Sequence, residues 1–293
     1  MPVVGGRTRR YLPKTMDNVL KINYGKIGLA VFASVIFVFL LIPSLMAIPM
    51  SFTNTLFLVF PPEGFTVKWY HNFLTEERWV EPTLLSLRLA GVTTLVSLIL
   101  GTLASLALVR GVLPFKRTIN LFVISPMMIP VIIIAFAAYG LYAKLHLIGS
   151  FWGVVIAHTI LCCPFVILIM NANLYRFDIN LEKAARNLGA SAMKTFLLIT
   201  LPLIKPGMFS AGIFCFITSM DELVLTMFLI GTKRTTLPLR IFSQIQFRVD
   251  PVVATASTFF VVASIAIVII LASIRLDSKK RYIKEQKDEL DRI

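Results

Sequence analysis

The sequence predicts an all-α polytopic membrane protein with six transmembrane helices, and three observations support this fold class. Hydrophobic residues make up 57% of the 293 residues, charged residues make up 15%, and the mean hydropathy is +0.82. A soluble globular chain is about 45–50% apolar and about 25% charged. The apolar residues gather in six runs, and roughly 20 residues suffice for a helix to cross about 30 Å of hydrocarbon.

The first run is too long for the core of a signal peptide and has no small-residue cleavage site, so we expect a retained helix. The third run contains Pro126 and Pro130, which predict a kink. Each of the six runs contains Gly, Pro or Ser, as membrane helices commonly do. The six predicted spans lie near residues 27–50, 84–109, 119–143, 151–170, 207–230 and 252–274.

The basic residues between the runs predict the orientation. With the N-terminus inside the cell, 21 Lys and Arg residues fall in cytoplasmic segments and seven fall on the other side. Cytoplasmic loops of membrane proteins carry this excess. We therefore expect cytoplasmic tails over residues 1–26 and 275–293, with a transmembrane domain over residues 27–274.

The net charge of +14 fits loops that face anionic lipid and does not indicate a nucleic-acid partner. Cys162, Cys163 and Cys215 lie inside apolar runs, which indicates small buried side chains rather than a metal site or a disulfide framework. The sequence has no G-x-x-x-x-G-K-[ST] loop and no paired acid–base or Ser–His arrangement. We expect no enzymatic activity, no metal and no cofactor in this chain.

The predicted outer loop, residues 51–83, contains an aromatic segment. Trp69, Tyr70 and Phe73 are spaced as the apolar side of a short helix. Aromatic side chains at this depth commonly anchor a protein at the membrane interface. We favour that role over a contact with a transported solute.

The predicted cytoplasmic loop, about residues 175–205, has the pattern of a helix, a turn and a second helix. Leu181, Ala184, Ala185 and Leu188 recur at helical spacing, and Gly189 then permits a left-handed turn. A second amphipathic helix follows, and Pro202 and Pro206 are expected to end it before the next span. Such a segment fits a groove on a partner protein, although a helix lying on lipid has the same pattern.

This loop resembles the cytoplasmic signature of the membrane subunits of ABC importers, in which Glu-Ala-Ala precedes a glycine and an Ile-x-Leu-Pro sequence. The residues that match are Ala184, Ala185, Gly189, Ile199, Leu201 and Pro202. Lys183 occupies the position of the usual glutamate, and Glu182 stands one place earlier. The resemblance implies that the loop holds the coupling helix that docks on the ATPase. The residues that it implies for this coupling are Glu182, Ala184, Ala185, Gly189 and Ala190.

A wider resemblance covers most of the chain. The segments FPPEGFTVKWYHNFL, SMDELVLTMFL and TTLPLRIFSQIQFRVDPVVATAST are similar to the second permease of putrescine and spermidine importers. The resemblance implies a type I importer permease in the bacterial inner membrane. It also implies a different homologous permease as partner, an ATPase dimer that holds ATP and Mg²⁺, and an extracytoplasmic solute-binding protein.

Two adjacent carboxylates, Asp221 and Glu222, lie in the fifth run, where ionisable residues are expensive and usually face a bundle interior or a water-filled cavity. One interpretation is structural, with the acids capping or anchoring a helix beside a cation. The other is that they line a path for a cationic solute. Successive helical residues point about 100° apart, so we favour Asp221 on the path and Glu222 nearer a helix interface.

Other polar residues of the spans are weaker candidates. Tyr139 and Ser219 are hypothesised to reach the path, and His158 is expected to be satisfied by a neighbouring helix rather than to relay protons. Two alternative functions remain open at this point. One keeps the importer but carries an amino-acid derivative or an opine, and the other is an ion-coupled secondary transporter, for which the inverted repeats are not found.

Overall fold

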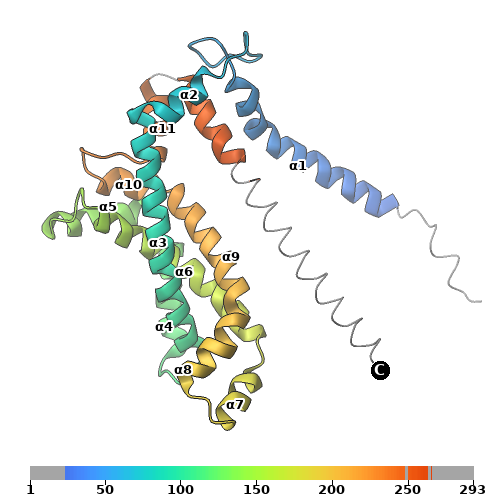
Figure 1. Ribbon diagram of the computed structural model, residues 1–293, viewed down its shortest axis with the longest axis vertical. Coiled ribbons are helices and arrows are strands. Elements are labelled where there is room, and N and C mark those ends of the chain that lie inside the picture. The colour runs from blue at the N-terminus through green and yellow to red at the C-terminus, as the bar shows by residue number, and fades with distance from the viewer. Residues whose placement is uncertain (1–23, 248–249, 263–264, 266–293) are drawn as a thin grey trace, which may run out of the picture. The chain divides into compact units, whose positions relative to one another are not determined.

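The computed structural model describes residues 24–247, 250–262 and 265, and the described part is helical without a strand (Figure 1). The chain forms two compact units, one that includes α1 and one that runs from Ser51 to Ala256. The all-α prediction is therefore confirmed for the part of the chain that the structure describes.

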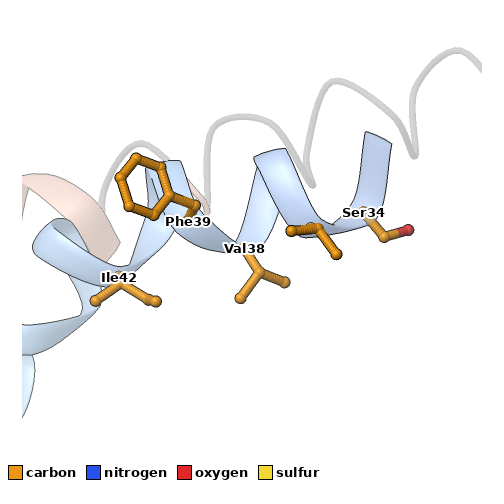
Figure 2. Close-up of a pocket in the computed structure, with 5 residues that line it drawn as sticks. Ser34, Val38, Phe39 and Ile42 are labelled. Atoms are coloured by element: carbon orange, nitrogen blue, oxygen red, sulfur yellow. The ribbon is translucent and has the colours of Figure 1, made fainter. Parts of the chain in front are cut away.

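In the first unit, α1 (Tyr24–Met50) is a single apolar helix. Its segment Gly28–Met50 is long and apolar enough to cross a membrane, as predicted for residues 27–50. The side chains from Leu29 to Leu45 are exposed, which fits a helix surrounded by lipid. Figure 2 shows a shallow hollow on this helix, and its lining is Ser34, Val35, Val38, Phe39 and Ile42.

The core of the second unit is formed by three long helices that pack on one another, α3 (Glu77–Arg110), α6 (Phe151–Arg176) and α9 (Leu201–Met220) (Figure 1). Small residues let their backbones approach closely. A Cβ atom added to Gly101 of α3 would lie 2.6 Å from Val166 Cγ1 of α6. Ser105 Oγ donates a hydrogen bond to the Ile167 carbonyl at 3.3 Å. These contacts make α3, α6 and α9 the rigid frame of the unit.

The third predicted span is broken more sharply than a kink. α4 (Lys116–Ile124) continues into the 3₁₀ turn η1 (Ser125–Met128), and α5 (Val131–Lys144) then runs off at an angle of 100°. Pro126 and Pro130 explain the break, because a proline lacks the N–H group that continues a helix and restricts the residue before it. The prediction of a kink at these prolines is confirmed.

The end of α3 that includes Trp79 is covered by α2 (Lys68–Thr75) and α11 (Leu237–Phe247), as Figure 1 shows. The predicted short helix is present, but Trp69 and Phe73 are buried inside the protein. Trp69 Nε1 donates to the Thr53 carbonyl at 2.6 Å, and the Phe73 ring lies 6.1 Å from the ring of Trp79. Membrane anchoring is therefore the wrong role for these two side chains, because protein contacts enclose them.

Four described helices are long and apolar enough to span a membrane, and the number is five if the bent pair of α4–η1 with α5 is counted as one span. For the sixth predicted span, the structure describes the helix Pro251–Val262, and most of the remaining residues to 274 lie outside the described part. The predicted tail over 275–293 and most of the tail over 1–26 also lie outside it. Six spans and two cytoplasmic termini stay predictions.

The contact between Gly101 and Val166 gives a test of this frame. Gly101→Ala is expected to lower the free energy of unfolding by about 1–3 kcal/mol, because the added methyl group overpacks the contact between α3 and α6. Gly91→Ala is the matched control, since Gly91 lies on the same helix with nothing within 4 Å of the added carbon. Thermal unfolding in mild detergent measures both, and equal stability of the two variants would contradict the packing described.

Candidate functional site

The loop between α6 and α9 forms the helix, turn and helix that its pattern predicted. α7 (Ile179–Asn187) begins where Asp178 Oδ1 accepts a hydrogen bond from the Asn180 N–H at 2.9 Å. It ends in a turn at Gly189, whose φ of 87° is in the left-handed region that favours glycine. The Ala190 N–H bonds to the Ala185 carbonyl and the Gly189 N–H to the Arg186 carbonyl, a Schellman C-cap. The turn therefore has a fixed geometry.

The second helix of this loop does not end at the prolines, which corrects the sequence prediction. α8 (Ala192–Thr195) continues through a π-helical turn, η2 (Phe196–Thr200), directly into α9. Pro202 lies two residues beyond the end of η2, and its missing N–H removes one backbone hydrogen bond from this continuous helix. The wider turn of η2 allows the helix to pass from loop to span without interruption.

Glu182 of α7 faces the unit's own helices. Its Oε1 accepts a hydrogen bond from Thr200 Oγ1 at 2.9 Å, and its Oε2 lies 3.6 Å from Arg110 Nε. Arg110, at the end of α3, also donates from Nη2 to the Phe177 carbonyl at 3.3 Å and lies over the Phe177 ring. These contacts hold α7 against the ends of α3, α6 and η2.

Sequence reasoning missed Arg110 and Thr200, although one feature points to the first. Arg110 is the first cation after the second predicted span, on the same predicted side of the membrane as Glu182. Thr200 gives no such indication, because its partner is 18 residues away across the turn.

The remaining residues of the predicted coupling set differ in exposure. Ala184 and Gly189 are exposed, while Ala185 and Ala190 are half-buried. Lys183, which occupies the position of the usual glutamate, is exposed, and Leu188 is 90% exposed. The loop therefore presents Lys183, Ala184 and Leu188 to solvent while Glu182 is turned inward.

The acid pair does not lie within a continuous helix, as the fifth predicted span at 207–230 implied. α9 ends at Met220, three residues follow without helical structure, and the short helix α10 (Val224–Leu229) begins again. α10 packs on α5 and α6, with Leu225 and Leu229 fully buried. Asp221 and Glu222 are thus the first two residues of a break between helices.

The two carboxylates have different surroundings. Glu222 is half-buried, and its Oε1 accepts a hydrogen bond from the Leu225 N–H at 2.8 Å, which satisfies a donor at the start of α10. Asp221 is exposed. Within the described residues, no Lys, Arg or His nitrogen lies within 4.0 Å of either carboxylate, so the pair is not neutralised by a neighbouring cation.

His158 of α6 joins the two sides of the break. Its Nδ1 lies 2.8 Å from Ser219 Oγ at the end of α9, and its Nε2 lies 3.2 Å from Thr226 Oγ1 on α10. The hydroxyl proton of Thr226 is donated to the Glu222 carbonyl at 3.0 Å, so Thr226 must accept from His158. This arrangement predicts that the His158 ring carries its proton on Nε2 and accepts from Ser219 at Nδ1. The expected satisfaction of His158 by a neighbouring helix is confirmed.

The other two hypothesised path residues, Ser219 and Tyr139, differ in exposure. Ser219 is only 4% exposed and its hydroxyl bonds to His158, so the structure gives it a supporting position behind the break and not an open one. Tyr139 of α5 is 44% exposed and its ring meets the Phe228 ring of α10 edge to face, 6.3 Å between centroids. Among the described residues, no group of three or more His, Cys, Asp or Glu is arranged to hold a metal ion.

The sequence matches the family described as the binding-protein-dependent transport system inner membrane component over residues 97–282. The chain belongs to this family. It is therefore a multi-pass permease subunit of the bacterial inner membrane, and the family is one of transport subunits.

Known relatives and a solved structure are similar over most of this permease. The spermidine/putrescine transport system permease protein PotC of Escherichia coli (strain K12) is 30% identical over 85% of this chain and 94% of its own length. The putrescine permease protein PotI of the same organism is 32% identical over 76% of this chain and 81% of its own. The putative 2-aminoethylphosphonate permease protein PhnV of Salmonella typhimurium is 30% identical over 75% and 83%.

A crystal structure of a bacterial ABC transporter that imports the acidic polysaccharide alginate has a similar fold. Its chain superimposes with a TM-score of 0.64 at 17% identity, covering 86% of this permease and 97% of that chain. At this identity the likeness concerns the fold alone.

The ion pair between Arg110 and Glu182 is testable in the isolated permease. Glu182→Gln and Arg110→Gln are each expected to lower thermal stability, and the double variant should lose less than the two effects combined, with a coupling energy of about 0.5–1 kcal/mol for a partly exposed pair. Lys183→Gln, which changes the neighbouring charge, is the control and should leave stability unchanged. Strictly additive effects of the two substitutions would show that the pair does not interact.

The proton position on His158 is a second test. Nitrogen-15 NMR of the permease labelled at histidine should show the His158 ring with a protonated Nε2 and an unprotonated Nδ1, assigned by its loss in His158→Gln. His158→Ala is expected to lower the free energy of unfolding by about 2–4 kcal/mol, because it leaves the buried Ser219 hydroxyl without its partner beside a cavity. A ring protonated on Nδ1 would contradict the hydrogen-bond directions given above.

Proposed function

We propose that this permease forms half of the translocation pathway of an ATP-driven, binding-protein-dependent importer, and that its solute is a small cation of the polyamine class. The second half is a homologous permease, ATP and Mg²⁺ are held by two ATPase subunits, and a solute-binding protein delivers the solute from outside. The termini and the α7–α8 loop lie in the cytoplasm. The observation that carries the proposal is the 30% identity with a spermidine/putrescine permease over 85% of the chain.

The break after α9 supports a cationic solute. Asp221 is an exposed carboxylate with no cation within 4.0 Å among the described residues, so its charge is available to an ammonium group. Tyr139 presents an exposed aromatic ring on the helix that packs on α10. A polyamine has several ammonium groups, which carboxylates and aromatic faces both attract. The Glu222 carboxylate already accepts the Leu225 N–H at the start of α10, so we assign the path role to Asp221.

The α7–α8 loop supports the coupling to an ATPase. The Schellman turn fixes α7 relative to α8, and Arg110 fixes α7 relative to α3. A push on α7 is therefore transmitted to α3, which packs along α6 and α9. Rocking of this frame around the solute site switches the side of the membrane that the site faces, and an importer of this kind needs these two states.

A second solute has specific support in the similarity to the putative 2-aminoethylphosphonate permease. That compound also carries an ammonium group, which Asp221 suits, but it carries a phosphonate as well. The spermidine/putrescine permease is similar over 85% of this chain, whereas the 2-aminoethylphosphonate permease is similar over 75%. We therefore favour the polyamine.

Uptake into proteoliposomes tests the proposal. The permease is reconstituted with its partner permease, ATPase and binding protein, and radiolabelled spermidine, putrescine and 2-aminoethylphosphonate are compared with and without enclosed ATP. We expect polyamine uptake that needs ATP and persists when a protonophore removes the proton gradient. Uptake that follows an ion gradient and ignores ATP would establish the secondary transporter instead.

Substitution of the two acids separates their roles. Asp221→Asn is expected to lower spermidine uptake by about tenfold, the loss of roughly 1.4 kcal/mol of interaction with an ammonium group. Glu222→Gln retains an oxygen that accepts from the Leu225 N–H and should keep most of the uptake. Binding-protein-stimulated ATP hydrolysis is the control for assembly in both variants. Normal uptake by Asp221→Asn would remove Asp221 from the path.

A further inference from the structure

We infer that the exposed face of the α7–α8 loop is cationic and that the ATPase groove that receives it is lined by carboxylates. The inference rests on the proposed function, because it assumes that an ATPase docks on this loop. It adds the chemistry of the partner surface, which follows from the direction in which each charged side chain of the loop points.

The acids of the loop are used within the permease. Glu182 is half-buried, accepts a hydrogen bond from Thr200 and pairs with Arg110. Asp178 is exposed, but its carboxylate accepts the Asn180 N–H and caps the first turn of α7. Glu182 is therefore not free to meet a cation of the ATPase in the way that an outward-facing glutamate at position 183 would be, and one oxygen of Asp178 is used by its cap.

The cations of the loop point to solvent. Lys183 and Arg186 are exposed and lie three residues apart, so they are neighbours on one side of α7. Lys194 is exposed on α8, beyond the Gly189 turn. Across the described residues, no carboxylate oxygen lies within 4.0 Å of any of the three. The fixed turn thus holds three unpaired positive charges on one short segment.

Exposed apolar side chains also lie on this loop. Leu181 is 49% exposed and Leu188 is 90% exposed on α7, and Met193 is 65% exposed on α8. An apolar centre with a charged rim is the usual composition of a protein–protein contact and of a helix that lies in a groove.

The position of the loop favours a protein partner over lipid. α7 follows the end of α6 at Arg176 and precedes the helix that leads into α9, so it lies beyond the ends of two spans. Figure 1 shows α7 and α8 at the opposite end of the second unit from α2 and α11. Carboxylates of the partner would pair with Lys183, Arg186 and Lys194, since complementary charge sets both specificity and the rate of association.

The test measures binding of the ATPase to the permease in nanodiscs. The probe is the ABC ATPase that co-purifies with this chain from its own host, separated from it and added back. We expect Lys183→Glu with Arg186→Glu to weaken binding at least about tenfold at roughly 0.1 M salt, and the difference to shrink at about 1 M salt, where charges are screened. Arg117→Glu, an exposed cation on α4, is the control for charge and should bind normally.

The outcomes separate the inference from the proposed function. Normal binding by the doubly reversed variant, with wild-type permease also binding, overturns the cationic face and leaves the importer intact. Failure of the wild-type permease to bind any ABC ATPase overturns the proposed function itself. An effect of charge reversal that occurs only with anionic lipid, and is absent in phosphatidylcholine nanodiscs, shows a lipid contact and overturns the inference. Lys183→Gln with Arg186→Gln should give intermediate binding and confirms that the loop tolerates substitution.

Discussion

The need to satisfy every backbone polar group inside hydrocarbon governs this structure, because water is not available there as an alternative partner. Continuous helices meet the requirement without help, but the chain interrupts its apolar stretches at Pro126–Pro130 and at residues 221–223. At the second interruption, Glu222 supplies an acceptor to the Leu225 N–H, and Thr226 supplies a donor to the Glu222 carbonyl. His158 then completes the set by bonding to Ser219 and Thr226 on opposite sides. An exposed carboxylate at Asp221 is possible because its neighbours stabilise the break.

Hydrogen bonds and an ion pair also explain the fixed geometry of the α7–α8 loop. A C-cap holds the end of α7 at Gly189, and an ion pair and a hydrogen bond hold its Glu182 side chain. These contacts fix α7 against the spans that the loop connects. Glu182 has a structural task here that a glutamate at position 183 would not have, because that position faces solvent. The displaced acid therefore alters which charges the permease offers to a partner.

Local features were predictable from the sequence, and long-range ones were not. The Gly189 turn and the bend at Pro126 and Pro130 follow from residues that act on their own backbone, so the pattern alone identifies them. The break after Met220 contains neither Gly nor Pro and lies in an apolar run, so nothing local indicates it. The partners of His158 are 61 and 68 residues away, and the enclosure of Trp69 and Phe73 depends on Thr53 and Trp79. Such contacts arise only when the helices are packed.

The central claim is that Asp221 faces a water-filled path that a cationic solute enters, and site-directed labelling measures this directly. A cysteine at position 221, in a permease whose three native cysteines are replaced by serine or alanine, is treated with a membrane-impermeant cationic thiol reagent in the assembled transporter. A cysteine at the buried position 219 serves as the reference. The account predicts that the cationic reagent labels position 221 rapidly and does not label position 219. Failure to label position 221 in any nucleotide state, or equal labelling at positions 221 and 219, would contradict it.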